Sequence, residues 1–484
     1  MKLTLPSEHL TLDVAQGAVL LDALREHGLQ PDAPCGGRGT CGKCRVVVNG
    51  VERLACQTKV EKDMTVALPE KMTAQILSSA QRASVVPDGT GTYCLAFDLG
   101  TTTVAAYLMD AKSGETLAQA NCMNPQIQYG ADVISRIQYA LEGHGRDLSS
   151  CVRQVLAGLT REAARHADIS PEEISTACIV GNTAMHHLLL NIDPKPLIVP
   201  PYMPAARESL CLPAKDLLPI AKDGTVRILP NIAGFVGSDT VGCLLATGLD
   251  TAEELTLLID IGTNGEMVLG DRNRRIACST AAGPAFEGAR IECGMRGTAG
   301  AVDHAAIRDG SLVFHTIGGE KPAGLCGSGL LDLIAALLET GELDGSGRLQ
   351  SGNVFRLEGT GVYLTQKDVR EVQLAKAAVR AGIEMMCAAM GVQAEDIRRV
   401  LLAGAFGNYM DPASACAIGM IPPVLLDRIC PVGNAAGEGA QMAALSRSAF
   451  DRSARLAGET AFLELASLPA FNDCYVDCLP FTED

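Results

Sequence analysis

Four cysteines near the N-terminus have the spacing of a metal-cluster site. Cys35, Cys41 and Cys44 lie in the segment APCGGRGTCGKCRVVVNG, and Cys56 follows in ERLACQTKV. Three thiolates on one tight loop, with a fourth from the next segment, can hold two irons. The glycines of the loop permit positive φ and let backbone N–H groups turn toward sulfur. The spacing therefore predicts that these four cysteines bind a [2Fe–2S] cluster.

Zinc binding and thiol redox chemistry are the two alternatives for these cysteines. Zinc sites often use paired CxxC units, whereas Cys56 has no near partner in the sequence. A redox CxxC would need neither Cys35 nor Cys56. Both alternatives explain fewer of the four residues than the cluster does.

The segments around the loop have the pattern of a small β-grasp domain. KLTLP, LTLDV, CRVVVNG and MTVALP alternate like short strands, and AVLLDALREHG has helical spacing. Residues 1–70 resemble [2Fe–2S] ferredoxin domains of the plant and xanthine-dehydrogenase kind. One departure is that five residues separate the first two cysteines, where the plant-type pattern has four.

An internal repeat follows the first domain. CLAFDLGTTTVAAYLMD and TLLIDIGTNGEMVLGD, aligned on Asp98 and Asp260, each show an apolar strand, an aspartate, Gly-Thr, a short polar turn and a second strand. Gly and Thr of such a turn can present N–H and hydroxyl groups to phosphate, and the aspartate can hold Mg²⁺ or orient water. Two such hairpins facing one another predict a nucleotide site.

The segments beyond the repeat complete an ATPase pattern. RRVLLAGAFGNYMD predicts a buried strand that ends in a turn where an adenosine can lie close to the backbone, at Gly404, Ala405, Phe406 and Gly407. GSDTVGCLLATGL and CPVGNAAGEGAQMAAL predict two small-residue helices. This order resembles actin, sugar-kinase and Hsp70-like ATPases. We expect an α/β fold with ATPase halves at 93–255 and 256–484, joined to the first domain by a linker over 71–92.

The combination resembles a more specific family. NPQIQYGADVISRI, GNTAMHHLL, CGSGLLDLIAALLETG and VLLAGAFGNYMDP, together with the cysteine motif, are similar to the reductive activators of corrinoid proteins. Some members carry an extra segment between cluster and ATPase, and this chain has at most the short linker. The resemblance implies one-electron return of Co(II) to Co(I) at the expense of ATP, with a [2Fe–2S] cluster, ATP and Mg²⁺ as cofactors.

The resemblance also implies roles for the residues of the two hairpins. Asp98 and Asp260 would organise Mg²⁺, and Glu266 would position the attacking water. The phosphate contacts would come from Gly100, Thr101, Thr102 and Thr103 in the first turn and from Gly262, Thr263, Asn264 and Gly265 in the second.

Composition limits the partners. The chain has 484 residues with 40 basic and 56 acidic side chains, a net charge of −16, which argues against nucleic acid and anionic membranes. It shows neither a long apolar segment nor a signal-peptide pattern, so we expect a cytoplasmic protein. The implied partners are a corrinoid protein of a methyltransferase system and an upstream electron donor, with a homodimer left open. The competing functions are a small-molecule kinase, an activator of a radical dehydratase and an actin-like filament protein.

Other chemically suggestive residues have simpler explanations. His186 and His187 are adjacent on a helix and so point in different directions, which favours packed histidines over a metal or cobalt site. Cys474 and Cys478 offer only two ligands and are expected to be structural. The methionines of GIEMMCAAMG are explained by packing of a helix in the core, without a cofactor.

Overall fold

The N-terminal domain is a five-stranded sheet covered by one helix. The computed structural model describes residues 1–6, 10–27, 29, 44–68, 85–262 and 264–481. The strand order is β2-β1-β5-β3-β4, with β1 and β5 parallel and the other pairs antiparallel. The strands are β1 (Lys2–Leu5), β2 (Leu10–Asp13), β3 (Arg45–Val48), β4 (Val51–Leu54) and β5 (Met64–Ala67). Helix α1 (Leu20–Glu26) buries Leu20, Leu21 and Leu24 on this sheet, because these positions share one helical face.

Lobe I of the ATPase domain is built on a six-stranded sheet of order β10-β11-β9-β6-β7-β8. The strands are β6 (Tyr93–Leu99), β7 (Thr103–Asp110), β8 (Thr116–Met123), β9 (Ile174–Gly181), β10 (Leu210–Pro213) and β11 (Thr225–Ile228). Alternate residues of β6 face opposite sides: Leu95 and Phe97 pack with α3 and α4, whereas Cys94 and Ala96 pack with α5 and α10. The helices are α2 (Val133–Tyr139), α3 (Gly145–His166), α4 (Thr183–Leu190) and α5 (Ser238–Thr247).

Lobe II repeats this design with the order β21-β20-β12-β13-β14-β22. Its strands are β12 (Thr256–Ile261), β13 (Gly265–Gly270), β14 (Arg275–Thr280), β20 (Arg399–Ala403), β21 (Ile429–Gly433) and β22 (Thr460–Phe462). In both sheets the first strand pairs antiparallel with the second and parallel with the fourth, so β6, β7 and β9 correspond to β12, β13 and β20. The predicted fold of two similar α/β lobes is confirmed.

Further elements complete lobe II. Two small sheets are attached to it, β16-β15-β17 and β18-β19. Their strands are β15 (Ala301–Arg308), β16 (Ser311–Thr316), β17 (Gly324–Leu325), β18 (Val354–Arg356) and β19 (Tyr363–Thr365). The helices are α6 (Gly327–Glu339), α7 (Gln366–Met390), α8 (Gly404–Tyr409), α9 (Pro412–Ala417), α10 (Ala435–Leu445), α11 (Arg447–Glu459) and α12 (Phe471–Asp477).

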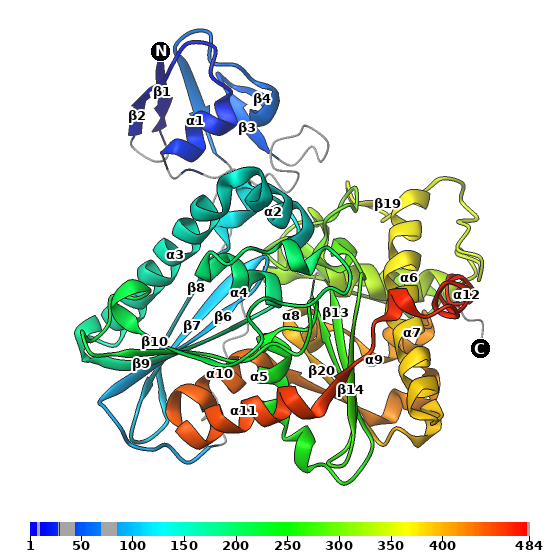
Figure 1. The fold of residues 1–484 in the computed structure, drawn as a ribbon. Coiled ribbons are helices and arrows are strands. Elements are labelled where there is room, and N and C mark those ends of the chain that lie inside the picture. The colour runs from blue at the N-terminus through cyan, green and yellow to red at the C-terminus, as the bar shows by residue number, and fades with distance from the viewer. Residues whose placement is uncertain (7–9, 28, 30–43, 69–84, 263, 482–484) are drawn as a thin grey trace.

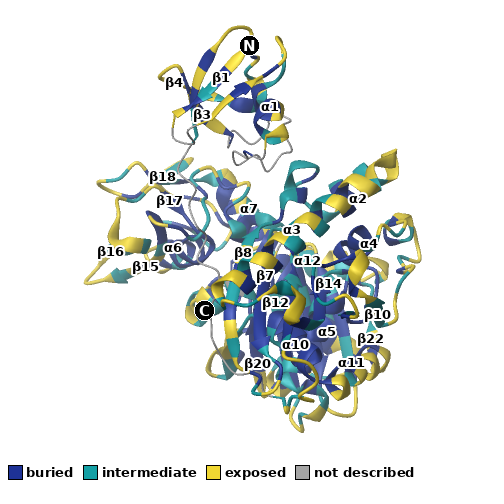
Figure 2. Cartoon of the chain, turned by 90° about the vertical axis from the view of Figure 1, so that its left-hand side faces the viewer, coloured by how far each residue is buried: buried dark blue, intermediate teal, exposed yellow. Residues whose placement is uncertain are grey.

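Helices α5, α10 and α11 form a layer shared by the two lobes. Their small residues pack in one cluster with apolar residues from both large sheets. Figure 2 shows the buried residues concentrated in this central region. α5 and α10 approach so closely that a Cβ on Gly439 would lie 2.1 Å from the carbonyl oxygen of Gly242. The absence of side chains at these two positions therefore permits the helix contact.

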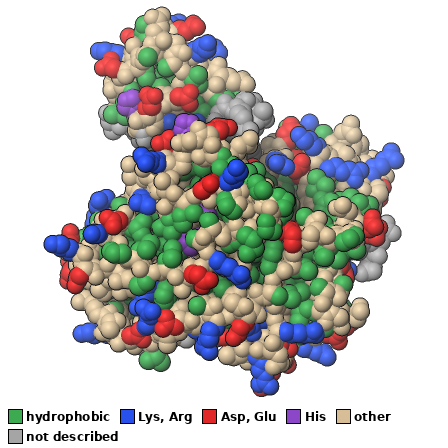
Figure 3. All heavy atoms as spheres, in the orientation of Figure 1, with side chains coloured by type: hydrophobic (Ala, Val, Ile, Leu, Met, Phe, Trp, Pro, Cys, Tyr) green, Lys and Arg blue, Asp and Glu red, His purple; other side chains and the backbone are tan. Residues whose placement is uncertain are grey.

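The N-terminal domain, called the cluster domain after its predicted [2Fe–2S] site, lies beside lobe I, above α2 and α3 in the view of Figure 1. The last residues of the expected linker are fixed on the ATPase domain: Asp88 accepts a hydrogen bond from the hydroxyl of Ser446 at 3.2 Å, and its N–H donates to Leu445 at 3.0 Å. Residues 69–84 lie outside the described residues. Basic and acidic side chains alternate over the face in Figure 3, and hydrophobic ones gather across the middle of the ATPase domain. Within the described residues, every helix is too short or too polar to cross a membrane.

Candidate cluster and nucleotide sites

Two of the four predicted cluster ligands lie side by side. Cys44 immediately precedes β3, Cys56 lies in a 3₁₀ turn over Ala55–Gln57, and their Sγ atoms are 3.2 Å apart. The N–H of Cys56 donates to the sulfur of Cys44 at 3.5 Å. Cys44 is buried and Cys56 is half-buried. Two adjacent sulfurs fit ligation of one iron, and Cys35 and Cys41 lie outside the described residues.

The first hairpin places Asp98 at the end of β6, close to a residue from the C-terminal half of the chain. Asn434 Nδ2 donates to Asp98 Oδ2 at 2.8 Å and lies 3.1 Å from the hydroxyl of Tyr107. Asn434 also caps α10, since its Oδ1 accepts from the N–H of Gly437. Burial raises the pKa of the Asp98 carboxyl, and the bond from Asn434 opposes that rise.

The second hairpin gathers three further carboxyl groups. Asp260 on β12 is directly opposite Glu266 on β13, and Asp239 lies in the first turn of α5. Burial and then the charge of Asp98 raise the pKa of Asp260 to about 6. Burial and then the charge of Asp260 raise the pKa of Asp239 to about 7. The pKa of Glu266 is also raised, first by burial and then by Asp239 and Asp260.

These four carboxyl groups interact electrostatically, and one or two of them could bind a divalent cation together with substrate phosphates. Asp98, Asp239 and Asp260 each raise the pKa of a neighbouring carboxyl because like charges at short range disfavour ionisation in a partly buried site. A hard cation with oxygen ligands relieves this repulsion, and Mg²⁺ typically binds one or two carboxylates together with substrate phosphates. The carboxyl oxygens here fit that role.

The first turn predicted to contact phosphate is held by side chains from lobe I and lobe II. Thr101 Oγ1 accepts from Asn182 Nδ2 at 2.8 Å, and Thr102 Oγ1 donates to Glu287 of lobe II at 3.0 Å. A Cβ on Gly100 would lie 2.7 Å from the carbonyl oxygen of Thr103, so the turn requires glycine there.

The second turn approaches lobe I near Asn182, the residue that binds Thr101 of the first turn. Asn264 lines the same small cavity as Asn182, and the N–H of Gly262 donates to the carbonyl of Asn264 at 2.9 Å. Gly265 begins β13, and a Cβ there would lie 2.9 Å from the hydroxyl of Thr280. Thr263 lies outside the described residues.

The expected adenosine turn forms the start of α8. Gly404 has φ +84°, and a Cβ there would lie 2.6 Å from Oδ1 of Asp260, so glycine is required by both conformation and space. Phe406 stacks on Phe286 with ring centroids 4.8 Å apart. Gly407 packs against Leu402, and the side chain of Ala405 lies outside the described atoms. Adenosine binding at this turn remains a prediction.

The two histidines are packed and hydrogen-bonded, as expected. His187 Nδ1 lies 2.7 Å from the carbonyl of Thr183, and its Nε2 accepts from the N–H of Ala205 at 3.1 Å. His186 Nδ1 lies 2.6 Å from Asn231 Nδ2. In the described part of the chain, His, Cys, Asp and Glu side chains form no group of three that could hold a metal ion by themselves, so Mg²⁺ near the four carboxyls would also need phosphate oxygens as ligands. The structural roles expected for Cys474 and Cys478 stay predictions.

Sequence reasoning missed Asp239 and Asn434. The segment GSDTVGCLLATGL was recognised only as a small-residue helix, although its aspartate stands at the helix start. Asn434 precedes α10 in CPVGNAAGEGAQ, a position at which an asparagine is ordinarily expected to cap the helix. A polar residue at the start of each of these two helices was the available signal.

Comparisons with known proteins agree with the fold. Residues 4–64 match the 2Fe-2S iron-sulfur cluster binding domain, residues 93–252 match the RACo middle region, and residues 254–484 match the C-terminal domain of RACo, the ASKHA domain. The N-terminal domain is thus a [2Fe–2S] domain and the remainder an ATPase of the ASKHA class, as the sequence predicted.

Two relatives and one solved structure extend over most of the chain. The chain is 32% identical to the corrinoid activation enzyme RamQ of Eubacterium limosum over 584 aligned positions, covering 98% of each chain. It is 25% identical to the [Co(II) methylated amine-specific corrinoid protein] reductase of Methanosarcina barkeri, covering 79% of this chain and 76% of that one. The structure of a reductive activator for corrinoid, iron-sulfur protein is 29% identical with a TM-score of 0.75, covering 99% of this chain and 98% of that one. The chain belongs to the family of reductive activators of corrinoid proteins.

Proposed function

We propose that this protein is an ATP-dependent activator that returns the Co(II) corrinoid of a partner protein to Co(I). The proposal is carried by the presence, in one chain, of a [2Fe–2S] domain and a two-lobed ATPase in which Asp98 and Asp260 interact electrostatically. Full-length similarity to proteins named as corrinoid activators supports it. A kinase or a filament protein has no use for the cluster domain.

Energetics explain why nucleotide is needed. Plant-type clusters have reduction potentials of about −400 mV, and Co(I) is a stronger reductant than such a cluster. Each 100 mV of deficit for one electron costs roughly 2.3 kcal/mol. ATP can offset this deficit only if the nucleotide-bound protein binds the corrinoid partner more tightly in its reducible state, because a ligand shifts an equilibrium through differential affinity.

The residues have the following proposed roles. Cys35, Cys41, Cys44 and Cys56 would hold the cluster, which supplies one electron at a time. Asp98 and Asp260 would hold Mg²⁺ and its waters, and the glycines and threonines of the two turns would contact phosphate. Glu266 would orient the attacking water, a role that its place opposite Asp260 supports. Asp239 would share the Mg²⁺ site, because Asp239 and Asp260 interact electrostatically. The backbone at Gly404, Ala405, Phe406 and Gly407 would face adenosine.

The cellular setting belongs to the same proposal. The partner would be a corrinoid protein of a methyltransferase system, and a separate electron donor would reduce the cluster. Both would act in the cytoplasm. Whether the protein works as a monomer or a homodimer would be decided by sedimentation.

The decisive experiment follows cobalt directly. Reduced protein is mixed anaerobically with a Co(II) corrinoid protein from a methyltransferase operon, and Co(I) absorbance is recorded with and without Mg·ATP. We expect appreciable Co(I) only with ATP, faster hydrolysis when the Co(II) partner is present, and no reduction by the Cys44→Ser variant. Equal cobalt reduction with and without ATP, across several partners, would contradict the proposal.

A further inference from the structure

A buried arginine lies directly behind the first phosphate turn. Arg136 on α2 has no exposed surface, and its Nη2 donates to the carbonyl of Thr101 at 2.7 Å. Its Nε donates to the carbonyl of Gly130 at 2.9 Å, and its Nη1 lies 3.4 Å from Gln126 Oε1. Within the described residues no carboxylate forms an ion pair with this guanidinium. Buried charges are costly unless paired, so a fully buried arginine that binds neutral groups calls for an explanation.

The hydrogen bonds of Arg136 fix the orientation of the phosphate turn. Asn124 Nδ2 donates to the carbonyl of Gly100 at 2.8 Å, and Arg136 holds the next carbonyl, that of Thr101. In a planar trans peptide the N–H points opposite to the C=O. The N–H groups of Thr101 and Thr102 are therefore directed away from Asn124 and Arg136, and neither donates to another described residue. Two oriented N–H groups of this kind are what a phosphate oxygen requires.

The same segment faces the cluster domain on its outer side. Between Asn124 and Arg136 the chain forms a 3₁₀ turn over Pro125–Gln128 and then enters α2, and Gln126 Nε2 ties this turn to the carbonyl of Leu148 at 2.9 Å. Tyr129 and Tyr139 stack on that outer side with ring centroids 5.0 Å apart. A Cβ on Gly130 would lie 2.9 Å from the backbone nitrogen of Arg136, so the segment is closely packed.

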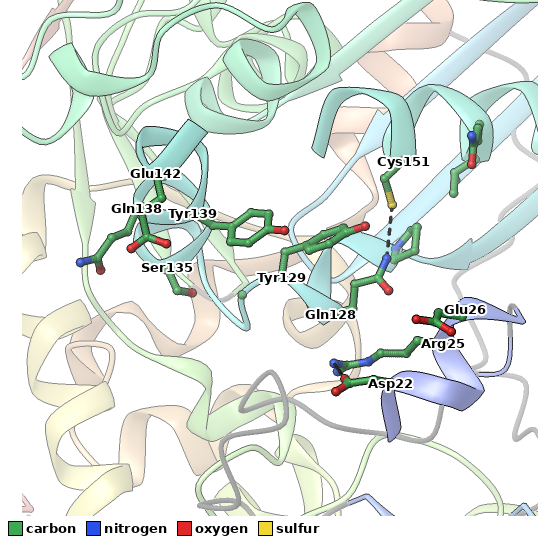
Figure 4. Close-up of a pocket in the computed structure, with 14 residues that line it drawn as sticks. Asp22, Arg25, Glu26, Gln128, Tyr129, Ser135, Gln138, Tyr139, Glu142 and Cys151 are labelled. Atoms are coloured by element: carbon green, nitrogen blue, oxygen red, sulfur yellow. Dashed lines mark hydrogen bonds and ion pairs between the residues drawn. The ribbon is translucent and has the colours of Figure 1, made fainter. Parts of the chain in front are cut away.

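Helix α1 of the cluster domain faces these residues across an open cavity of about 970 Å³. Asp22, Arg25 and Glu26 line it on one side, and Gln128, Tyr129, Tyr139 and Cys151 are among the residues on the other (Figure 4). Arg25 lies near enough to affect the Tyr129 hydroxyl electrostatically. A junction with so much open space lets the cluster domain change its position at small cost, in contrast to the densely packed lobes.

We infer that Arg136 is a positioning residue that couples the phosphate turn to the surface that faces helix α1 of the cluster domain across the cavity. One end of its hydrogen-bond set holds the peptide of Thr101, and the other holds Gly130, next to Tyr129 at the cavity. When phosphate binds and moves the turn, Arg136 moves the segment 124–139 with it. The surface that faces α1 across the cavity then changes its position. The residue thus links nucleotide binding to the placement of the electron carrier. The inference rests on the proposed nucleotide site.

Hydrogen exchange of the full-length protein tests this coupling without any corrinoid partner. Exchange is measured for α1 and for residues 129–139, with and without saturating Mg²⁺ and a nonhydrolysable ATP analogue. We expect nucleotide to change the exchange of both segments at least about twofold in the wild-type protein. In Arg136→Lys, at saturating nucleotide, the change in α1 should disappear, because lysine cannot hold two carbonyls in a fixed fork.

A matched control separates coupling from general loss of structure. Arg153 on α3 also binds two carbonyls, those of Leu189 and Asp216. Neither carbonyl belongs to the phosphate turn. Arg153→Lys should retain the wild-type response of α1. A response of α1 that is equal in wild type and Arg136→Lys would overturn the inference, as would its absence in a wild-type protein that binds nucleotide. Failure of the wild type to bind nucleotide at all would instead overturn the proposed nucleotide site, and the coupling with it.

A second pair of variants tests the cluster-domain side and does not depend on the folding of lobe I. In Arg25→Ala, nucleotide should still change the exchange of residues 129–139, whereas the change in α1 should fall at least about twofold. Arg53 is an exposed arginine on β4 of the same domain, and Arg53→Ala should behave as wild type. An unaltered α1 response in Arg25→Ala would contradict coupling through this junction.

Discussion

Asn434 and Asp98 are joined by a 2.8 Å hydrogen bond although 336 positions separate them in the chain. The donor lies at the start of α10, and the acceptor is the next-to-last residue of the first strand of lobe I. Because a donor stabilises the ionised carboxylate, this bond keeps the pKa of Asp98 below the value that burial alone would give.

Asn434→Asp should therefore impair hydrolysis most at low pH. The substitution keeps an acceptor for the helix cap but replaces the donor with a like charge, so the pKa of Asp98 rises. A higher fraction of protonated Asp98 weakens Mg²⁺ binding, and the acid limb of the kcat profile should move to higher pH, with about a tenfold loss at its midpoint. Steady-state ATP hydrolysis from pH 5 to 9 measures this. Asn121→Asp, at an exposed position on β8, is the control, and an unmoved acid limb in Asn434→Asp would refute the role of the bond.

The raised carboxyl pKa values predict how stability depends on pH without metal. Asp239 and Asp260 titrate at about 7 and about 6 in the folded protein, against an ordinary value of 3.8. Between about pH 4 and 7 the folded state binds more protons than the unfolded state, so the free energy of unfolding falls as pH rises. Asp239→Asn should remove part of this slope and stabilise the metal-free protein by about 1 kcal/mol or more at pH 8.

Mg²⁺ should act most strongly where these carboxyls are ionised. We expect Mg·ATP to raise the thermal midpoint more at pH 8 than at pH 5.5, and to do so less in Asp239→Asn. Differential scanning fluorimetry over this range measures both effects, and Asp223→Asn at an exposed site supplies the comparison. Equal stabilisation by Mg·ATP at both pH values would argue against a carboxylate cation site.

Cys44→Ser should remove the chromophore but leave the ATPase lobes folded. Anaerobically purified wild-type protein should contain about two irons and two sulfides per chain. The variant should lose most of this iron while its nucleotide-induced thermal shift persists, because the lobes have their own cores. Cys211 is exposed on β10, and Cys211→Ser should keep full iron content. Zinc in place of iron in the wild-type protein would show that the cluster assignment is wrong.

Two glycine substitutions should have opposite signs. Gly439→Ala inserts a methyl 2.1 Å from the carbonyl oxygen of Gly242 and should destabilise the protein by about 1–3 kcal/mol through overpacking of α5 against α10. Gly158 lies at an exposed position of α3 with no atom near its hypothetical Cβ, so Gly158→Ala should stabilise by about 0.5–1 kcal/mol. Urea unfolding of both variants provides the measurement. A neutral Gly439→Ala would mean that the two helices can separate freely.

The sequence predicted the parts of the site that repeat or that have characteristic spacing. The hairpins around Asp98 and Asp260 were visible because strand, aspartate and Gly-Thr turn occur twice, and Cys44 and Cys56 were visible by their spacing. Asn434 and Asp239 were not, because their importance arises only when helices from distant segments meet the first strand of each lobe. Strand β4 was also not predicted, since VERL has only weak alternation and pairs as a hairpin with β3.

The position of α10 and α11 has a consequence for the order of folding. The cluster domain completes its core with contacts among residues 3–68, so it can fold once that short segment has been synthesised. The inner face of lobe I, in contrast, is covered by residues of α10 and α11, which leave the ribosome only when most of the chain has been made. Contacts between such distant residues are slow to form. A nascent chain would therefore have thiolates ready to accept iron while its nucleotide cleft has yet to form.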